Sequence, residues 1–560
     1  MAMDACVSRN IDIFLHINSS CPLSDQHLLS LNHHHHQALT LKLGEGGYGS
    51  YTVVLTACLV IVGIAWLLRQ LEYNVDEGKS QELREYETTG DSSSTAEGQW
   101  ALPGKWVRPL NSMELLYAVG RVNTAQVLYL KSTSPVTVQL VQRALTILAE
   151  NVLLLQLEMV WRWWWPWFRR TKAVTVHLSQ STEEPMAVYQ KQMNAEYDTS
   201  NGPLWHATLV HPQHSSQESV LVLTIHHMIG DGTTNMLLSR DLLTIINGLA
   251  TGQENHIPCR DLVPPVFQSL FSLSDALTVF TLFFWGCRNN ILRSLQGGAA
   301  YLLPSPNPSP PITKAITYDF SREVTAQLNS RCKEEDVRIS SVLLAASIFA
   351  YTHTVQEEGK CTKQMEVTHE TAVNLRRYYS DRHQEALGAV AFTMSLKHHV
   401  THDSNFWALA RRIQQDLYKA LDQDKLPLHF SQLGCLLSFI FPINWVLEWC
   451  GLRSFAYSQI FLTNMGNLRT LLPATYHGPI RITRLLRSFS AHYLGMCFGV
   501  VTQTFDGCLL ISIDHYSNKT TDETASCFLR NLVQILTDVA SNSTPSPFHL
   551  IKPHVPPSNS

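Results

Sequence analysis

The strongest chemical signal in the sequence is the segment HHMIGDG, residues 226–232. A histidine has an ordinary pKa near 6.5, so it can take a proton as a general base at neutral pH. The segment follows a continuous apolar run, residues 220–225, which is typical of a strand buried on both faces. Because side chains alternate along a strand, His226 and His227 point to opposite sides, and only one of them can enter a given cleft.

The residues after the two histidines predict a turn from strand into helix. Gly230 and Gly232 permit a tight reversal, including positive φ, and Asp231 can lock it through a hydrogen bond or an ion pair. Leucine and isoleucine recur at helical spacing over residues 233–252, where Thr233 or Thr234 can cap the start and glycines end the helix.

Three interpretations of the histidine pair remain open at this stage. The pair is structural, or it binds a metal together with Asp231, or one histidine is a general base. Adjacent histidines on a strand point apart and ligate one metal poorly, so we expect no metal. The general-base interpretation gains weight from the full seven-residue pattern.

The elements that position these residues form two mixed α/β (α+β) lobes. A proline-rich segment, residues 302–313, cannot continue a helix or a central strand, and it separates residues 100–301 from residues 314–545. Strand-like and helix-like runs alternate in both parts, which indicates mixed sheets with flanking helices. In the second lobe we expect helices at 322–332 and 340–351, and strands at 372–375, 389–396 and 509–513.

The segments outside the two lobes differ from them in composition. Residues 1–50 are polar without a sustained period and predict disorder, and residues 70–99 are acidic and serine-rich, as in a flexible tether. Residues 51–69 are almost free of charge and just long enough for a membrane span, the alternative being a buried core helix. Basic residues after this span favour a single-pass membrane protein, with its body on the cytosolic side and the endoplasmic reticulum as the candidate organelle. Residues 546–560 form a tail.

Charge and cysteine content exclude several classes of protein. Forty-two basic and 46 acidic side chains give a net charge of −4, without the basic stripe that a nucleic-acid partner requires. Twelve cysteines without regular spacing fit neither a disulfide scaffold nor a zinc ribbon.

Three stretches are unusually apolar: residues 161–170, 276–287 and 435–450. Core packing explains them, but tryptophan beside arginine, as in WRWWWPWFRR, is also the composition of a bilayer interface. We therefore expect the body to rest on a membrane and to receive a lipophilic substrate from it.

With these residues in place, the sequence resembles the condensation-domain superfamily of chloramphenicol acetyltransferase-like acyltransferases. HHMIGDG matches the HHxxxDG motif of that superfamily, and the resemblance is greatest to its alcohol acetyltransferase, polyketide-associated acyltransferase and wax ester synthase branches. The agreement extends over about residues 100–541 in the correct order. The further matching segments are GPLW at 202–205, RISSVLLAA at 338–346, AVNLR at 372–376, LGAV at 387–390 and FLTNMG at 461–466.

The resemblance also has departures that bear on the substrate. Ser340 and Ser341 stand where the wax ester synthases have Asn-Asp, and the DFGWG segment of the plant acyltransferases is absent. No adenylation or carrier domain flanks the body, so a peptide-synthetase module is not expected.

The resemblance implies two chloramphenicol acetyltransferase-like lobes with an active-site tunnel between them. It implies that His227 is the general base, His226 a supporting residue, and Gly232 part of the turn. Asp231 would be structural and would pair with an arginine, for which Arg376 is the candidate.

FLTNMG resembles the SNLG loop of the alcohol acetyltransferase branch. Through that resemblance, Thr463, Asn464 and Gly466 are candidates for stabilising an oxyanion or shaping the tunnel, the alternative being a simple turn.

The resemblance implies an acyltransferase that moves an acyl group from acyl-CoA to a hydroxyl of a lipophilic acceptor. The transfer would be direct, since the chain carries no nucleophile motif such as GxSxG. Acyl-CoA would be a co-substrate, no cofactor would be permanently bound, and we expect a monomer. Two alternatives are an N-acyltransferase that forms an amide and a catalytically inactive, membrane-tethered lipid-binding protein.

Overall fold

The computed structural model describes residues 103–162, 165–211, 217–253, 257–263, 303, 310–360, 364–378, 384–422, 458–472, 478–491, 496–543 and 545–547. All of them belong to the second of the two units into which the chain divides, Glu97–Ser560. The predicted N-terminal segment, anchor and linker (residues 1–99) lie outside the described residues. So do the apolar stretches 276–287 and 435–450, most of the proline-rich crossover, and tail residues 548–560.

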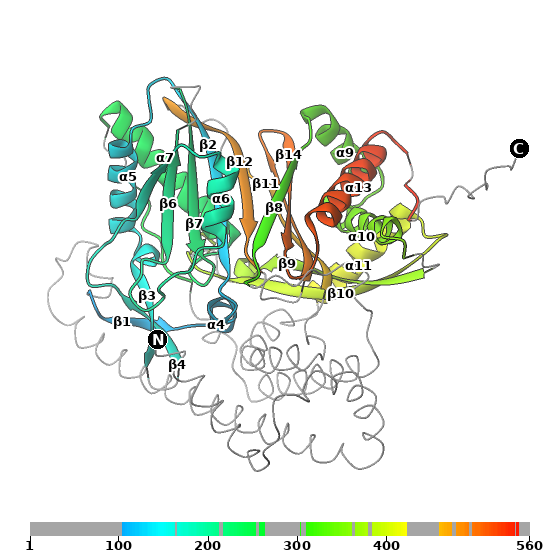
Figure 1. Ribbon diagram of the computed structural model, residues 1–560, viewed down its shortest axis with the longest axis horizontal. Coiled ribbons are helices and arrows are strands. Elements are labelled where there is room, and N and C mark those ends of the chain that lie inside the picture. The colour runs from blue at the N-terminus through cyan, green and yellow to red at the C-terminus, as the bar shows by residue number, and fades with distance from the viewer. Residues whose placement is uncertain are drawn as a thin grey trace, which may run out of the picture. The chain divides into compact units, whose positions relative to one another are not determined.

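The first lobe is built on a five-stranded mixed sheet in the order β12-β2-β7-β6-β5 (Figure 1). Its strands are β2 (Asn123–Ser132), β5 (Leu178–Ser181), β6 (Trp205–Val210), β7 (Glu218–His226) and β12 (Ile480–Phe489). All neighbours are antiparallel except β5 and β6. Its helices are α4 (Ser112–Val119), α5 (Val138–Asn151), α6 (Pro185–Met193) and α7 (Gly232–Thr251), with a 3₁₀ turn at Leu153–Gln156.

The second lobe is built on a six-stranded mixed sheet in the order β10-β9-β11-β13-β14-β8. Its strands are β8 (Thr313–Asp319), β9 (Gln364–Asn374), β10 (Ala391–Thr401), β11 (Ser458–Asn467), β13 (Met496–Phe505) and β14 (Cys508–Tyr516). Strand β11 runs parallel to β9 and β13. The helices are α9 (Arg322–Glu334), α10 (Ile339–Glu357), α11 (Phe406–Asp422) and α13 (Asp522–Ala540), and a 3₁₀ turn at Leu375–Tyr378 follows β9. Two mixed α/β lobes, as the sequence predicts, are therefore present.

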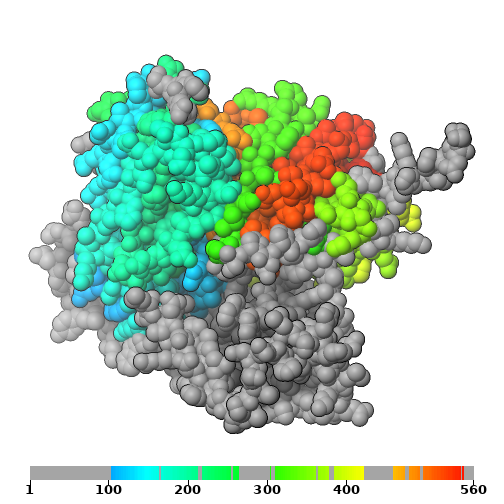
Figure 2. Space-filling view, viewed as in Figure 1, coloured from blue at the N-terminus to red at the C-terminus, as the bar shows by residue number. Residues whose placement is uncertain are grey.

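Strand β12 joins the two lobes, because it follows β11 of the second lobe in the chain but pairs with β2 of the first. Its main-chain N–H at Phe489 donates to the buried carboxylate of Asp514 on β14 at 3.0 Å. The apolar core of the first lobe also continues across this boundary to Val501 and Tyr516. Helix α6 and helix α13 both contact β8, which lies between the first lobe and α13 (Figures 1 and 2). The predicted boundary at residues 302–313 does not anticipate this exchange of a strand.

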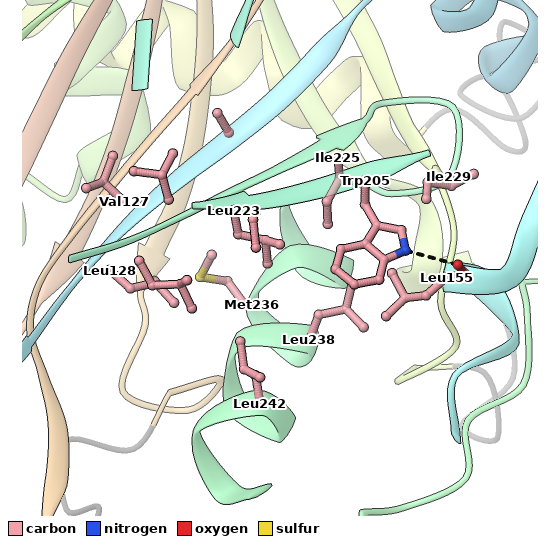
Figure 3. Packing of buried hydrophobic residues seen from close by; sticks show 14 of the residues in the cluster. Val127, Leu128, Leu155, Trp205, Leu223, Ile225, Ile229, Met236, Leu238 and Leu242 are labelled. Atoms are coloured by element: carbon pink, nitrogen blue, oxygen red, sulfur yellow. Dashed lines mark hydrogen bonds between the residues drawn. The ribbon is translucent and has the colours of Figure 1, made fainter. Parts of the chain in front are cut away.

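Helix α7 is held against the first sheet by apolar side chains. Leu223 and Ile225 of β7 are buried, as is Leu238 of α7. Figure 3 shows the indole of Trp205 lying against Leu238, and its N–H donates to the carbonyl of Leu155 at 3.0 Å. Burying a side chain of this size contributes on the order of 2 kcal/mol. The strand and the helix on either side of HHMIGDG therefore have fixed positions.

A small third sheet, in the order β1-β4-β3, lies in the first lobe and contains β1 (Trp106–Pro109), β3 (Leu157–Arg162) and β4 (Trp165–Arg170). Phe168 is buried at 1% exposure and Trp161 is 51% exposed. The tryptophan-rich segment is thus a β-hairpin with both buried and exposed aromatic side chains.

Among the described residues, no helix combines the length and apolar character that a bilayer crossing requires. The predicted span at residues 51–69 lies outside that part of the chain.

Candidate active site

The HHMIGDG segment forms the turn between β7, which ends at His226, and α7, which begins at Gly232. Main-chain hydrogen bonds anchor both histidines: the N–H of His226 donates to the Leu204 carbonyl and that of His227 to the Val122 carbonyl, each at 2.8 Å. The helix cap differs from the prediction. Asp231 is the N-cap, because its extended backbone lets its carboxylate accept the N–H of Thr234 at 2.9 Å.

His227 is partly exposed, and its imidazole packs on Tyr117 of α4. The two rings are stacked, with centroids 3.9 Å apart and an interplanar angle of 13°. Nδ1 of His227 is buried without a hydrogen-bond partner in the described residues. Nε2 also makes no hydrogen bond there, but it is not among the buried unpaired atoms. It is therefore the nitrogen open to an incoming molecule.

Burial is the main reason why the His227 ring is expected to be neutral. Burial lowers its pKa below the ordinary value of 6.5, and the Arg487 guanidinium lowers it further. The main chain of His227 and Gly230 and the carboxylate of Asp231 act in the opposite direction without reversing the shift. A neutral imidazole at pH 7 has the free lone pair that a general base requires.

His226 is more deeply buried than its neighbour, with 3% exposure. Its Nδ1 accepts the main-chain N–H of Met228 at 3.2 Å, so the neutral ring carries its proton on Nε2. Tyr197 lies edge-on to the ring, with centroids 5.9 Å apart. Burial, together with the proximity of His227, lowers the pKa of His226 to about 3. This environment suits a neutral residue that shapes the turn.

Asp231 and Arg376 form a buried ion pair, with Asp231 Oδ2 2.6 Å from Arg376 Nη1 and side chains 4% and 1% exposed. Oδ2 also accepts the main-chain N–H of Val390 at 3.1 Å. Burial alone would raise the pKa of Asp231, but the charge and hydrogen bond of Arg376 and the N–H groups of Thr234 and Val390 bring it below its ordinary value. The Asp231 carboxylate is thus fully committed to holding the turn.

Arg376 also holds the segment that follows β9. Its Nε donates to the carbonyl of Ala386 at 3.0 Å, and its Nη2 donates to the hydroxyl of Thr234 at 3.0 Å and to the carbonyl of Gly388 at 3.1 Å. The AVNLR and LGAV segments of the second lobe are therefore bonded to the start of α7 in the first.

The glycines of the motif have a different role from the predicted one. Neither Gly230 nor Gly232 has a positive φ. Instead, a Cβ atom on Gly232 would lie 2.8 Å from Nη1 of Arg487 and 2.8 Å from Sδ of Met465. The ends of these two side chains fill the space around this Cα, so an added Cβ would displace them; close packing and not backbone conformation is what favours glycine here.

The FLTNMG segment, which resembles a loop of the alcohol acetyltransferase branch, is part of strand β11 and not a simple turn. Alternation along the strand places Thr463 and Met465 on one face and Asn464 on the other. Met465 approaches Gly232, whereas the amide of Asn464 donates to the Ser340 hydroxyl of α10 at 3.0 Å. Thr463 therefore lies on the face that meets the motif, and Asn464 does not.

Gly466 has φ of +64° and its N–H donates to Asn464 Oδ1 at 2.8 Å. The pairing register of β11 with β13 shifts between Asn464 and Asn467, so this glycine lies within an irregularity of the strand. Both residues shape the end of β11, and neither contacts the histidine pair through a hydrogen bond within the described residues.

Three side chains at the site were not predicted from the sequence: Tyr117, Met465 and Arg487. Tyr117 and Arg487 belong to no motif, and they reach the turn only because α4 and β12 pack beside it. Met465 lies inside FLTNMG, but the face on which it points depends on the strand. No group of three or more histidine, cysteine, aspartate or glutamate side chains suited to a metal occurs in the described part of the chain.

Comparison with known proteins places this geometry in a family. The model of the condensation domain matches residues 126–430, which is 305 of the 560 residues and 54% of the chain. The chain belongs to the condensation-domain family. A mixed α/β fold with two sheet-rich lobes is what this family shares, and it supports a function in acyl transfer in general.

Similar proteins of known sequence or structure agree with that assignment. A linear gramicidin synthase of Brevibacillus parabrevis is 27% identical over 186 residues, which are 31% of this chain and only 4% of that protein. Trichothecene 15-O-acetyltransferase of Fusarium sporotrichioides aligns with a TM-score of 0.62 at 10% identity, over 77% of this chain and 95% of that one. Polyketide synthase associated protein 5 of Mycobacterium tuberculosis aligns with a TM-score of 0.55 at 16% identity, over 78% and 99%. At these identities the two structures establish the fold alone.

Proposed function

We propose that the protein transfers an acyl group from acyl-CoA to a hydroxyl of a lipophilic acceptor, with His227 as the general base. The observation that carries this proposal is the geometry at His227: the residue is partly exposed, and its Nε2 makes no hydrogen bond in the described part of the chain. The lowered pKa of the ring agrees with a neutral base. A hydroxyl acceptor is part of the proposal, and one protein with the same fold is named as an O-acetyltransferase. The similarity to a gramicidin synthase is the reason to retain the amide-forming alternative.

The proposed reaction is a direct transfer. Nε2 of His227 takes the proton of the acceptor hydroxyl while the oxygen attacks the thioester carbonyl, which forms a C–O bond and a tetrahedral oxyanion. The oxyanion collapses, the C–S bond breaks, and the CoA thiolate takes the proton from the imidazolium to leave as a thiol. Proton transfer by one positioned histidine raises the reaction rate about 10²–10⁴-fold. The remaining acceleration comes from holding both substrates in place.

The surrounding residues would support this chemistry without reacting. Stacking on Tyr117 fixes the plane of the His227 ring, and the Asp231–Arg376 pair fixes the turn that carries it. Thr463 remains the oxyanion candidate from β11, because it lies on the face that meets the motif. Asn464 would act indirectly, by joining β11 to the start of α10.

A product assay tests the proposed function directly. The purified protein is incubated with a series of acyl-CoA esters, from acetyl to long-chain, and with matched fatty alcohols, short alcohols and fatty amines, and the products are identified by mass spectrometry. Esters with long-chain alcohols support the proposal. Amides in place of esters assign the N-acyltransferase alternative, and an unchanged acyl-CoA pool with every acceptor contradicts the proposed reaction.

The aromatic sheet β1-β4-β3 supports a membrane as the source of a lipophilic acceptor. Trp106 and Trp161 are 38% and 51% exposed. The guanidinium of Arg162 lies 4.9 Å from the ring centroid of Trp167 and 5.6 Å from that of Trp106. Indole rings with attached cations suit the headgroup region of an anionic bilayer. We propose that this sheet rests on such a surface, on the cytosolic face of the membrane that residues 51–69 would span, with the endoplasmic reticulum as the candidate.

Vesicle sedimentation of the protein tests this surface. Wild type is expected to sediment with phosphatidylserine-containing vesicles more than with pure phosphatidylcholine, and Trp161→Ala to lose part of that difference. Tyr418→Ala is the matched control, since Tyr418 is a similarly exposed aromatic residue of α11, at 44%. Equal sedimentation of both variants with both lipids would contradict the proposed orientation.

A further inference from the structure

Arg487 brings a buried positive charge to the start of α7. This residue of β12 is only 6% exposed. Its Nε donates to Oε1 of Gln503 at 2.9 Å, and its Nη2 to the carbonyl of Thr502 at 3.5 Å. Its Nη1 makes no hydrogen bond within the described residues. The bonds of the other two nitrogens therefore hold Nη1 in place while it has no partner of its own in that part of the chain.

The third nitrogen is directed at the helix terminus. A Cβ atom on Gly232, the first residue of α7, would lie 2.8 Å from Nη1. The first N–H groups of a 20-residue helix have no intrahelical acceptor and carry the positive end of its dipole. A guanidinium and a helix N-terminus, both positive, thus converge on the turn that carries His227.

Within the described residues, no carboxylate is hydrogen-bonded to Arg487. The carboxylate of Asp231 is committed to Arg376 and to two main-chain N–H groups. That of Asp514 accepts hydrogen bonds from the Phe489 N–H and from the hydroxyls of Ser488 and Ser512.

The charge of Arg487 persists at neutral pH. Burial lowers its pKa to about 10, although Tyr189, Asp514 and Asp231 act to raise it. A buried charge without a directly bonded counter-ion is unfavourable, and an anionic oxygen delivered by a ligand would relieve that penalty.

We propose that Nη1 of Arg487 and the first turn of α7 form a site for an anionic oxygen of the substrate beside His227. This inference rests on the proposed acyl transfer. The oxygen has two possible sources with the same chemistry. One is the oxyanion that forms transiently on the thioester carbonyl, and the other is a permanent carboxylate or phosphate of the acceptor.

Binding of inorganic phosphate tests the site without reference to turnover. The melting temperature of the full chain is measured in sodium phosphate and in sodium chloride of equal ionic strength, for wild type, Arg487→Gln and Arg481→Gln. Arg481 is an exposed arginine of the same strand. Phosphate is expected to stabilise wild type and Arg481→Gln, but not Arg487→Gln. Absence of stabilisation in wild type, or its retention in Arg487→Gln, would overturn the proposal.

Arg487→Lys serves if Arg487→Gln does not fold. A single ammonium keeps the charge but cannot bond Gln503 and Thr502 and still reach Gly232. The phosphate effect is therefore expected to be smaller than in wild type. An undiminished effect in Arg487→Lys would count against a guanidinium-specific site.

Kinetics with a neutral acceptor and a carboxylated one, a fatty alcohol and the ω-hydroxy fatty acid of the same chain length, separate the two sources. If Arg487 stabilises the oxyanion, Arg487→Gln lowers kcat about 10²–10³-fold with both acceptors and leaves KM nearly unchanged. If Arg487 binds a permanent anion, Arg487→Gln raises KM for the carboxylated acceptor only, and the kinetics with the fatty alcohol stay unchanged. Kinetics equal to those of Arg481→Gln with both acceptors, in an enzyme that His227→Ala inactivates, would reject this role for Arg487 while the proposed acyl transfer stands.

Discussion

Asp231 and Arg376 are 145 residues apart in the sequence, and their side chains meet at 2.6 Å between Oδ2 and Nη1. The aspartate caps α7 of the first lobe, and the arginine bonds the main chain around Gly388 in the second. The pair thus holds the turn that carries His227 and joins the two lobes at the same point. Both oxygens of Asp231 are occupied, so we expect the contribution of the pair to be structural.

Replacing Asp231 is expected to destabilise the protein strongly. Asp231→Ala leaves the Arg376 guanidinium buried without its counter-ion, which lowers the free energy of unfolding by about 3–5 kcal/mol. Asp319→Ala is the control, since Asp319 pairs with Arg484 where both side chains are about one-third exposed, and it should cost less than about 1 kcal/mol. Urea denaturation measures both. Equal losses in the two variants would show that the buried pair has no special role.

Replacing Gly232 by alanine is expected to reduce activity more than stability. The added Cβ would lie 2.8 Å from Arg487 Nη1 and from Met465 Sδ, and both are the ends of side chains that can shift. The shift would move Arg487 away from the site, so kcat should fall while the unfolding free energy changes by only about 1 kcal/mol. Gly232→Ala/Met465→Ala removes one of the two contacts and should recover part of the activity. No recovery would argue that the glycine acts through the backbone.

The pH dependence of kcat/KM should report the His227 environment. Burial and Arg487 lower the pKa of this ring below 6.5, so a base at His227 is expected to be neutral at pH 7 and to lose activity as the pH falls below 6.5. Arg487→Gln removes a positive charge near the ring. The acidic limb of its residual activity should therefore move to higher pH. A limb centred above pH 6.5 in wild type would contradict the neutral, shielded ring.

Stability should also depend on pH through His226. Its folded-state pKa is lowered to about 3, so the unfolded chain binds a proton below pH 6.5 that the folded chain does not. The contribution of His226 to the free energy of unfolding is fully present above pH 6.5. It declines as the pH falls toward 3, and at pH 5 the loss is on the order of 2 kcal/mol. His226→Asn keeps an acceptor for the Met228 N–H and should flatten that slope. Denaturant unfolding at pH 7 and pH 5 compares the two proteins, and identical slopes would reject the assignment.

Much of the local structure could be predicted from the sequence where the periodicity is strong. The run at 220–225 lies within β7, and the predicted helix at 233–252 corresponds to α7, Gly232–Thr251. The helix predicted at 340–351 is α10, Ile339–Glu357, which is buried on nearly every side as its apolar pattern indicates. Strand β7 ends at His226 and His227 already lies in the turn, so the alternation argument for the two histidines reaches only to the end of the strand.

What the sequence could not provide is what depends on distant parts of the chain. The resemblance of FLTNMG to a loop does not show that the segment is a strand, because that depends on its pairing with β13. The cap at Asp231 and the packing at Gly232 depend on how the first turn of α7 meets Arg487 and Met465. The residues of β12 do not indicate that this strand crosses into the first sheet. The proximity of Arg487 to Gly232 depends on that crossing, so it could not be predicted.

The most direct test of His227 as the general base is the release of CoA from acyl-CoA, in the presence of an accepted alcohol, by wild type, His227→Ala and His399→Ala. His399 is a histidine with a 70% exposed side chain on β10, so its variant controls for the loss of an imidazole. His227→Ala is expected to lower kcat about 10²–10⁴-fold while its melting temperature stays close to that of wild type, and His399→Ala is expected to behave as wild type. A folded His227→Ala protein that releases CoA at the wild-type rate would contradict the proposed mechanism.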